Sequence, residues 1–464
     1  MDKSLKQNFT VVLLGGGHTN TQVINTLHRN DFPDHTELIL VSDGDKAFYS
    51  GMIPGFLARL YCESDLVVSL SQLCQSSGWE FIYASVNRIE ANRRLIHFED
   101  PNLRALKYDC LLANVGSKTF GSDLPGVKKY AVCTRPLSSL GSRLSELDEL
   151  HFSKEQSSTS RELVIVGGGA AGCEMAMALQ SRWNSRCCLS VTLIVRRLLP
   201  QRATRVSTRL RQILQSKGIK LIENSSVSSV NQNHIDLNDD SQIPFDVLIW
   251  ATGAEAHSFI SKNSDLSLSK DGWIEVFPTL QSISHPEVFA AGDCCTFPSM
   301  SSPPSKSGVF AVRQGPVLTK NLLAFLNKLP LQAYNPQSDF LSLLMTGDGK
   351  ALGTKFGIAF YGRWVWKMKD WIDRSWMRTF HNRDSKDSFM DAESISSCKQ
   401  SLSANTAERV LQIGNESNRN EGLEVYSPRD DEFSEQLQVL EKMSSSPQFA
   451  AEVIQHLNKS ELSS

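Results

Sequence analysis

The stretch that decides the fold is ELVIVGGGAAGCEMAMAL, residues 162–179. Its apolar run 164–166 predicts a buried strand, and Gly167, Gly169 and Gly172 then follow with the spacing G-x-G-x-x-G. Such a turn between a strand and a helix can hold a diphosphate on the backbone N–H groups at the helix N-terminus. The stretch therefore predicts a dinucleotide-binding turn.

A similar turn lies near the start of the chain, in VVLLGGGHTN at residues 11–20. Gly15 and Gly17 fit the same spacing, but Asn20 stands where a third small residue is expected. By itself this turn is a weak indication of a nucleotide site. We expect a helix over 21–28 and expect Asn20 to loosen the packing of that helix on its strand.

The two turns belong to a longer repeat. GWEFIYASVNRIEANRRLIHFED from residue 78 and GIKLIENSSVSSVNQNHIDLNDD from residue 218 each predict a strand followed by a hairpin. Each copy closes with a similar nonamer, YDCLLANVG at 108–116 and FDVLIWATG at 245–253. Duplication of a nucleotide-binding unit explains this shared order, so Asn20 is a local departure inside a real site.

The composition of the chain is that of a globular protein with room for two or three domains. It has 464 residues, of which 41% are hydrophobic and 21% charged, and its formal net charge is −2. A net charge of −2 does not favour binding to nucleic acid. No apolar run is long enough to span a membrane. Eight residues before the first strand are too few for a signal peptide. We expect an intracellular protein, cytoplasmic or associated with an organelle.

The ten cysteines show no C-x-x-C or zinc-type spacing, which predicts reduced thiols and no metal site. The adjacent pairs 187–188 and 294–295 are interpreted as packing residues, because a disulfide between neighbours needs strained geometry.

A third motif indicates the class. PEVFAAGDCCTF, residues 286–297, is an apolar strand that ends in Gly292 and Asp293. Placed after two dinucleotide units, it resembles the flavin-ribityl motif of the pyridine nucleotide-disulfide oxidoreductase superfamily. The resemblance implies an α/β fold with two Rossmann-like domains of the glutathione-reductase type, and FAD as cofactor. It also implies that Asp293 accepts hydrogen bonds from the ribityl chain and that a helix over about 309–326 points at the flavin.

The dithiol motifs of the disulfide reductases are absent, since VSDGDKAFYSGMIPGFLARLY has no cysteine before Cys62. The chain therefore looks like the type II NADH dehydrogenase branch. YSGMIPG (49–55), PPSKSGVFAVRQGPVLTKNL (303–322) and GRWVWKMKDWIDRSWM (362–377) look closest to a subgroup sometimes fused to selenide, water dikinase. No dikinase domain follows here, so kinship gives only a weak indication of a role in selenium metabolism.

By this resemblance the FAD-binding domain is split around the NAD(P)H-binding domain. The expected ranges are 1–130 and 281–338 for the FAD-binding domain, 131–280 for the NAD(P)H-binding domain, 339–385 for a C-terminal cap and 386–464 for a largely disordered tail with one helix over 432–442.

The resemblance also distributes the cofactor-binding residues. Gly15, Gly17, Thr19 and Asn20 would bind the FAD diphosphate; Ser42 or Asp43 the adenosine ribose; Gly292 and Asp293 the ribityl; and Gly167, Gly169 and Gly172 the diphosphate of NADH or NADPH. Arg196 and Arg197 follow the second unit's strand where an acid is usual. They would pair with the 2′-phosphate of NADPH, the alternative being solvated surface charge.

Two residues are candidates for catalysis. Glu174 would lie near the nicotinamide and flavin rings, or would be an exposed glutamate that the helix dipole favours. Lys306 would bring a positive charge to the flavin, or would be a solvated loop lysine. For His18 we expect a role in capping the turn rather than in binding a phosphate.

The cap contains a tryptophan-rich helix. An apolar arc of about 140° is predicted, with the charged side chains opposite. The arc holds Trp364, Val365, Met368, Trp371, Ile372 and Trp376, and the opposite side holds Lys367, Asp370, Asp373, Arg374 and Arg378. The arc either packs on the protein's own core or forms a peripheral membrane contact through 362–380. A homodimer is left open.

Three functions compete. The favoured one is an FAD-dependent NAD(P)H oxidoreductase with a small quinone-like electron acceptor. The second is a sulfide:quinone-type reductase, whose chemistry needs cysteines beside the flavin, although 296–397 holds none. The third is a flavin- or NAD(P)H-binding sensor with little turnover.

Overall fold

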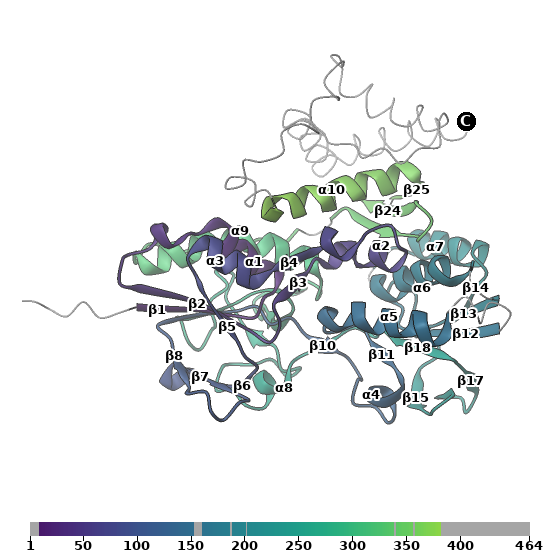
Figure 1. Cartoon of the computed structure of the whole chain (residues 1–464), viewed down its shortest axis with the longest axis horizontal. Helices are drawn as coiled ribbons and strands as arrows, with labels where there is room; N and C mark the ends of the chain where they lie inside the picture. The colour runs from purple at the N-terminus through teal and green to yellow at the C-terminus, as the bar shows by residue number, and fades with distance from the viewer. Residues whose placement is uncertain are drawn as a thin grey trace, which may run out of the picture.

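A computed structural model describes residues 9–152, 160–185, 188–200, 202–337, 340–355 and 358–381. Two parallel sheets with their helices form the two halves of the molecule, and a small cap lies across both (Figure 1). This architecture confirms the α/β prediction. The expected tail 386–464, with its helix over 432–442, lies outside the described residues.

The first sheet contains the strand that precedes the first glycine turn. Its five strands run parallel in the order β21-β9-β1-β2-β5. They are β1 (Phe9–Leu14), β2 (Thr36–Ser42), β5 (Glu80–Tyr83), β9 (Cys110–Ala113) and β21 (Val288–Ala290). The central strands are apolar on both faces, as expected for a parallel sheet covered by helices.

The second sheet, β11-β18-β12-β13-β14, is also all parallel, and its last four strands repeat the order β9-β1-β2-β5 of the first sheet. Its strands are β11 (Val132–Cys133), β12 (Ser160–Val166), β13 (Cys188–Ile194), β14 (Ile219–Ile222) and β18 (Val247–Trp250). Each unit also carries an antiparallel three-stranded sheet at the predicted hairpin. These are β6 (Val86–Glu90), β7 (Leu95–Phe98) and β8 (Leu106–Lys107), and β15 (Val227–Val230), β16 (His234–Leu237) and β17 (Gln242–Pro244). The matching topologies confirm the repeat.

The helices that follow the glycine turns begin immediately after them. They are α1 (His18–Thr26) and α6 (Ala170–Trp183), and α3 (Leu70–Ser77), α7 (Thr204–Ser216) and α9 (Gly308–Leu326) are further helices of the two halves. The helix after the first turn therefore spans 18–26 and not the predicted 21–28. Gly17 is the N-cap of α1, and the extended backbone of Leu27 ends it.

Further helices and strand pairs complete the two halves. They are α2 (Ile53–Leu57), α4 (Val127–Tyr130), α5 (Leu140–His151), α8 (Ser258–Ser261), and the strand pairs β3 (Lys46–Phe48) with β4 (Val67–Ser69), β10 (Lys118–Thr119) with β19 (Ala254–Glu255), and β20 (Ile274–Glu275) with β22 (Cys295–Thr296).

Helix α9 packs on α1 and is held there by a side-chain hydrogen bond. Pro316 lies inside α9 and has no N–H to donate to the carbonyl of Val312. The Nε2 of Gln22 on α1 donates to that carbonyl instead, at 3.0 Å. Gly315 leaves room for this approach, because a Cβ there would lie 2.5 Å from the Gln22 amide oxygen. The contact fixes the start of α9 next to the first glycine turn.

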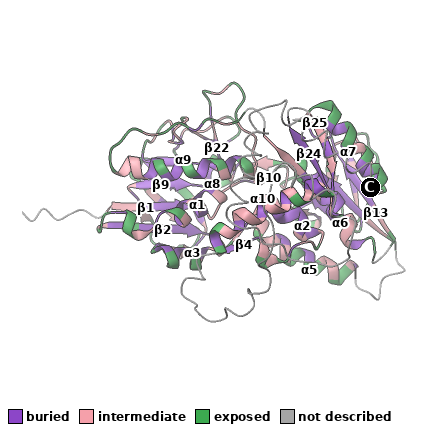
Figure 2. Cartoon of the chain, turned by 90° about the horizontal axis from the view of Figure 1, so that it is seen from above, coloured by how far each residue is buried: buried purple, intermediate pink, exposed green. Residues whose placement is uncertain are grey.

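The cap consists of an antiparallel sheet and the long helix α10 (Arg363–His381). Its strands are β23 (Ser342–Met345), β24 (Ala351–Lys355) and β25 (Ile358–Gly362). Seen from above in Figure 2, α10 crosses the middle of the molecule, between the half that holds β1 and the half that holds α6. None of the helices that the structure describes combines the length and the apolar character needed to cross a bilayer.

The face of α10 that packs on the body differs from the predicted apolar arc. Its most buried side chains include Lys369 and Asp373, together with Val365, Met377 and Phe380. The assignment of Asp373 to the solvent side was wrong. Its partner Tyr49 lies 324 residues away in the chain, so helical periodicity alone could not identify it.

Candidate active site

The two glycine turns have backbone geometries that need glycine. Gly15 and Gly167 adopt φ angles of +90° and +140°. A Cβ at Gly17 would lie 2.2 Å from the side-chain oxygen of Asn114, and one at Gly172 would lie 2.1 Å from the carbonyl oxygen of Gly167. Both helices therefore start in direct contact with their sheets.

In the first turn, Asn20 tightens the packing that we expected it to loosen. Its side chain is fully buried and its Nδ2 donates to three backbone carbonyls, of Leu14 (3.3 Å), Gly15 (2.9 Å) and Leu112 (3.2 Å). In the second turn, Gly172 occupies the equivalent position. The amide of Asn20 thus makes hydrogen bonds where Gly172 avoids a collision.

A second asparagine, Asn114, caps α1 from the neighbouring strand end. Its Oδ1 accepts from the backbone N–H groups of Thr19 (3.0 Å) and Asn20 (3.3 Å), and its Nδ2 donates to the carbonyl of Ala291 (2.7 Å). These contacts leave the N–H groups of Gly17 and His18 as the helix N-terminal donors beside the turn.

Both units have room for a ligand at the same place. Gly116 and Gly253, at the ends of the two repeated nonamers, have positive φ and open space where a Cβ would be. Gly169, the N-cap of α6, has open space too. Backbone that can be approached closely beside a helix N-terminus suits a dinucleotide diphosphate, so the residues present fit FAD and NAD(P)H.

The two candidates for binding the adenosine ribose of FAD differ in their exposure to solvent. Ser42 is buried at the end of β2, where its Oγ accepts from Gly44 N. Asp43 is exposed at the same sheet edge. Arg196 and Arg197 are exposed just beyond the end of β13. The loop that carries them is tied to the second glycine turn, because Leu199 N donates to Gly168 O at 2.8 Å.

Asp293 lies between the two units. Its carboxylate accepts from Ser117 Oγ at 2.9 Å and forms an ion pair with Arg135 at 3.1 Å. The preceding Gly292 has a φ of +74°, and its N–H donates to Gln314 Oε1 of α9 at 2.6 Å. Asp293 is thus held at the meeting point of the first sheet and α9.

Lys306 is not a solvated loop lysine. Its Nζ donates to the carbonyl of Cys295 and lies 4.3 Å from the ring centroid of Trp273. Burial lowers the pKa of Lys306, although Asp293 and the neighbouring thiols oppose this effect. Cys294 and Cys295 are buried free thiols, which supports their interpretation as packing residues.

His18 plays a different role from the predicted cap. Its Nε2 lies 3.2 Å from the donating N–H of Ser50, and burial lowers the pKa of His18 to about 4. A neutral imidazole therefore connects α1 to the turn at Ser50. The ring centroids of Tyr49 and Trp376 each lie 5.7 Å from that of His18.

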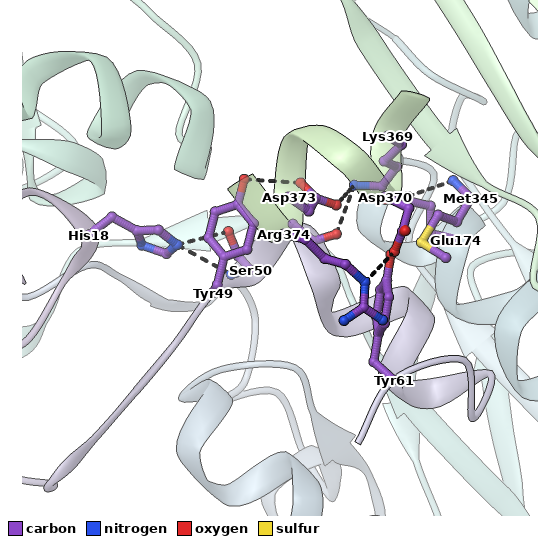
Figure 3. A network of polar contacts seen from close by, with 11 residues as sticks. His18, Tyr49, Ser50, Tyr61, Glu174, Met345, Lys369, Asp370, Asp373 and Arg374 are labelled. Atoms are coloured by element: carbon purple, nitrogen blue, oxygen red, sulfur yellow. Dashed lines mark hydrogen bonds and ion pairs between the residues drawn. The ribbon is translucent and has the colours of Figure 1, made fainter. Parts of the chain in front are cut away.

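On α10, a buried ion pair faces this turn (Figure 3). Lys369 Nζ lies 2.8 Å from Asp373 Oδ2 and donates to the carbonyl of Gly51 at 2.8 Å. The hydroxyl of Tyr49 donates to Asp373 Oδ1 at 3.1 Å. Burial opposes the charge of Lys369, but Asp373 and Glu174 outweigh that effect and hold its pKa above the usual value.

Glu174 completes the cluster from α6. Its Oε1 accepts from Met345 N of β23 at 2.8 Å. Burial raises the pKa of Glu174 to about 7, and Lys369 limits the rise. Glu174 is thus no exposed first-turn glutamate.

The sequence did not identify this cluster as a unit. Tyr49 lies in the stretch YSGMIPG, but nothing in that stretch indicates its partner. The only signal for Lys369 and Asp373 is their spacing of four residues, which places opposite charges on one side of a helix. That spacing is more often found on a solvated face.

The fold and the site define a protein of the two-dinucleotide-binding oxidoreductase class. The defining features are the two repeated dinucleotide units, the acidic residue at their meeting point and the shared cap. The chain belongs to the pyridine nucleotide-disulphide oxidoreductase family, whose model matches residues 9–315.

Relatives of this chain include enzymes that are named for quinones. Demethylphylloquinone reductase NdbB of Synechocystis is 24% identical over 367 residues, which cover 76% of this chain and 88% of the relative. The type II NADH:quinone oxidoreductase of Haemophilus influenzae is 25% identical over 288 residues, covering 55% and 64%. These relatives support the predicted type II NADH dehydrogenase branch.

Solved structures show the same fold. NDH2 from Plasmodium falciparum in complex with NADH aligns with a TM-score of 0.66 and 15% identity, covering 82% of this chain and 98% of the other. Sulfide:quinone oxidoreductase from Aquifex aeolicus aligns with a TM-score of 0.65 and 16% identity, covering 81% and 92%.

Proposed function

We propose that this chain is an FAD-dependent oxidoreductase that takes a hydride from NADH or NADPH and delivers electrons to a quinone-like acceptor. The observation that carries the proposal is the place of Glu174. This carboxyl group lies on α6, the helix that follows the second glycine turn, where the two units and the cap meet. Burial raises its pKa to about 7.

FAD, when bound, accepts the hydride and passes electrons on to the acceptor. The residues that would hold it are Gly15, Gly17, Thr19 and Asn20 at the first turn, Asp43 or Ser42 at the end of β2, and Gly292 and Asp293 at the meeting point. Gly167, Gly169 and Gly172 would hold the NAD(P)H diphosphate. The open backbone at Gly116, Gly169 and Gly253 supports this assignment.

The assignment of the domain ranges stays a prediction as well. The order of the first sheet supports it, because β21, from after the second unit, pairs with β9.

Reduction of a quinone by NAD(P)H consumes one proton beyond the transferred hydride. Glu174 would hold that proton, because below about pH 7 its carboxyl is mainly protonated and above that pH mainly ionised. The Met345 N–H fixes one carboxyl oxygen, so the other remains to hold and release the proton. Lys306 would supply a positive charge on the Asp293 side of the same region.

The alternatives stay weaker. A sulfide:quinone-type reductase needs reactive cysteines, whereas burial raises the pKa of each fully buried thiol near this region, Cys173, Cys294 and Cys295. A sensor with little turnover remains the alternative from another class. Peripheral membrane contact through 362–380 and a homodimer stay predictions.

The test is steady-state oxidation of NADH and NADPH by the purified, FAD-loaded protein, with a soluble quinone analogue or with ferricyanide. We expect turnover with both acceptors. Ferricyanide takes single electrons without protons, so Glu174→Gln should slow the quinone reaction at neutral pH far more than the ferricyanide reaction. A wild-type protein that oxidises neither nucleotide would favour the sensor.

A further inference from the structure

Helix α10 presents a row of basic side chains to solvent. The helix lies above both halves of the molecule in Figure 1. At 3.6 residues per turn, four of its cations fall within an arc of about 60°. These four residues form the basic row of α10: Arg363, Lys367, Arg374 and Arg378. The first two are exposed and the other two are half-buried.

The charge of the row is not balanced by the acids around it. Arg374 forms ion pairs with Asp370 at 3.0 Å and with Asp65 at 3.1 Å, so it neutralises both of these acids. The other three cations of the row have no ion-pair partner among the residues that the structure describes. They are therefore free to bind an anionic partner.

Two further cations lie next to the start of the row. The guanidinium of Arg209 and the amino group of Lys350 lie 5.5 and 5.8 Å from the ring centroid of Tyr361, two residues before α10 begins. The acid nearest in the chain, Asp348, is paired with Lys217 at 2.8 Å. The basic surface thus continues from α10 onto the neighbouring part of the cap.

This face of α10 offers charge but no exposed large apolar side chain. Every large apolar side chain of the helix is buried or half-buried, and the ring of Trp376 stacks on that of Tyr49 with 4.3 Å between the centroids. A helix that lies in a bilayer surface inserts its apolar face into the lipid. In α10 that face packs on the protein's own core, so the basic row suits a soluble anionic partner better than a bilayer.

We propose that the basic row binds an acidic segment of this same chain, residues 421–441. The segment, EGLEVYSPRDDEFSEQLQVLE, has seven acidic side chains and one basic side chain. Single exposed ion pairs contribute little, but several opposite charges can act together as a network. The proposal goes beyond the proposed function and does not depend on it.

The position of the segment in the chain supports this assignment. Helix α10 ends at His381, and the segment begins about 40 residues later; a flexible chain of that length spans roughly 35 Å. This span exceeds the length of a 19-residue helix, which is about 28 Å, so the segment can reach every cation of the row. A tethered partner also acts at an effective concentration of about a millimolar, which favours it over a separate anionic molecule.

The test is carbodiimide cross-linking of the full-length, FAD-loaded protein, followed by peptide mass spectrometry. Carbodiimide joins a lysine amine directly to a carboxyl group that contacts it, and Lys367 is the reporter in the row. We expect cross-links from Lys367 to residues of 421–441 in the monomeric fraction at low salt. They should disappear at about 1 M salt, where the Debye length is only about 3 Å.

Two pairs of variants test whether the row itself makes the contact. Arg363→Gln with Arg378→Gln removes two charges of the row and keeps the reporter, and should lower the yield of the cross-link about 3- to 10-fold. Lys262→Gln with Lys270→Gln is the matched control, because it removes the same charge from exposed positions outside the cap. The control should change the yield by less than about twofold.

An exchange of charges guards against a structural effect of the arginine substitutions. Arg363→Glu with Arg378→Glu should abolish the cross-link, and the addition of Asp430→Lys with Asp431→Lys should restore it, because the two surfaces are then complementary again.

Three results would overturn the proposal: no cross-link from Lys367 to 421–441, an equal loss in both pairs of variants, or cross-links confined to a dimeric fraction. The bilayer is the competing partner. If the cross-link is absent and the wild type floats with phosphatidylserine vesicles while Arg363→Gln with Arg378→Gln does not, the basic row is a membrane contact instead.

Discussion

Replacing Asn20 by alanine tests whether the departure from the glycine fingerprint is a defect or a support. The Asn20 Nδ2 makes three hydrogen bonds, each worth about 0.5–1.5 kcal/mol net. The carbonyl of Leu14 also accepts from Asn114 N, and the Oδ1 of Asn20 is buried without a partner, so the full sum is not expected. We expect Asn20→Ala to lower the free energy of unfolding by roughly 1–2 kcal/mol.

The assay is urea unfolding of the FAD-loaded protein, followed by the midpoint at unchanged m-value. Asn114→Ala is the comparison. It removes the acceptor of two buried N–H groups and the donor to Ala291 O, so its loss should be larger, roughly 3–5 kcal/mol. An Asn20→Ala variant that is as stable as the wild type, or more stable, would refute the reasoning, since the side chain would then be merely tolerated.

Two further predictions concern the cofactors. Asp293→Ala should strip the flavin from a soluble protein, because loss of a charged acceptor costs roughly 2–4 kcal/mol; flavin retained at wild-type occupancy after gel filtration would mean that the ribityl site is misplaced. Replacing Arg196 and Arg197 by alanine should raise the KM for NADPH by about 10- to 100-fold and leave that for NADH nearly unchanged, as measured by steady-state kinetics; an equal effect on both nucleotides would return these residues to surface charge.

The parts of the fold that depend on residues close together in the chain could be predicted from the sequence. A glycine turn specifies its own strand and helix, because a Cβ at Gly167 or Gly172 would collide with the backbone. The repeat predicted that the turn, the hairpin and the closing strand occur twice, and both units contain them. The start of α1 was misplaced because Gly17, as N-cap, lets the helix begin three residues before the expected position.

The part of the site that depends on distant residues could not be predicted. The Tyr49–Asp373 and Tyr61–Asp370 hydrogen bonds join residues separated by 324 and 309 positions. Periodicity sorts side chains into apolar and polar faces, and it therefore assigned the buried Asp373 to solvent. A buried ion pair reverses that sorting, because each charge satisfies the other.

The most direct test of the central claim is anaerobic stopped-flow mixing of the FAD-loaded protein with NADH or NADPH, observed at the flavin absorbance. We expect the oxidised flavin band to bleach within the turnover time and to return when a quinone analogue is added. In Glu174→Gln we expect this return to be slower at neutral pH. A flavin that stays oxidised in the presence of both nucleotides would mean that the protein is not an NAD(P)H oxidoreductase.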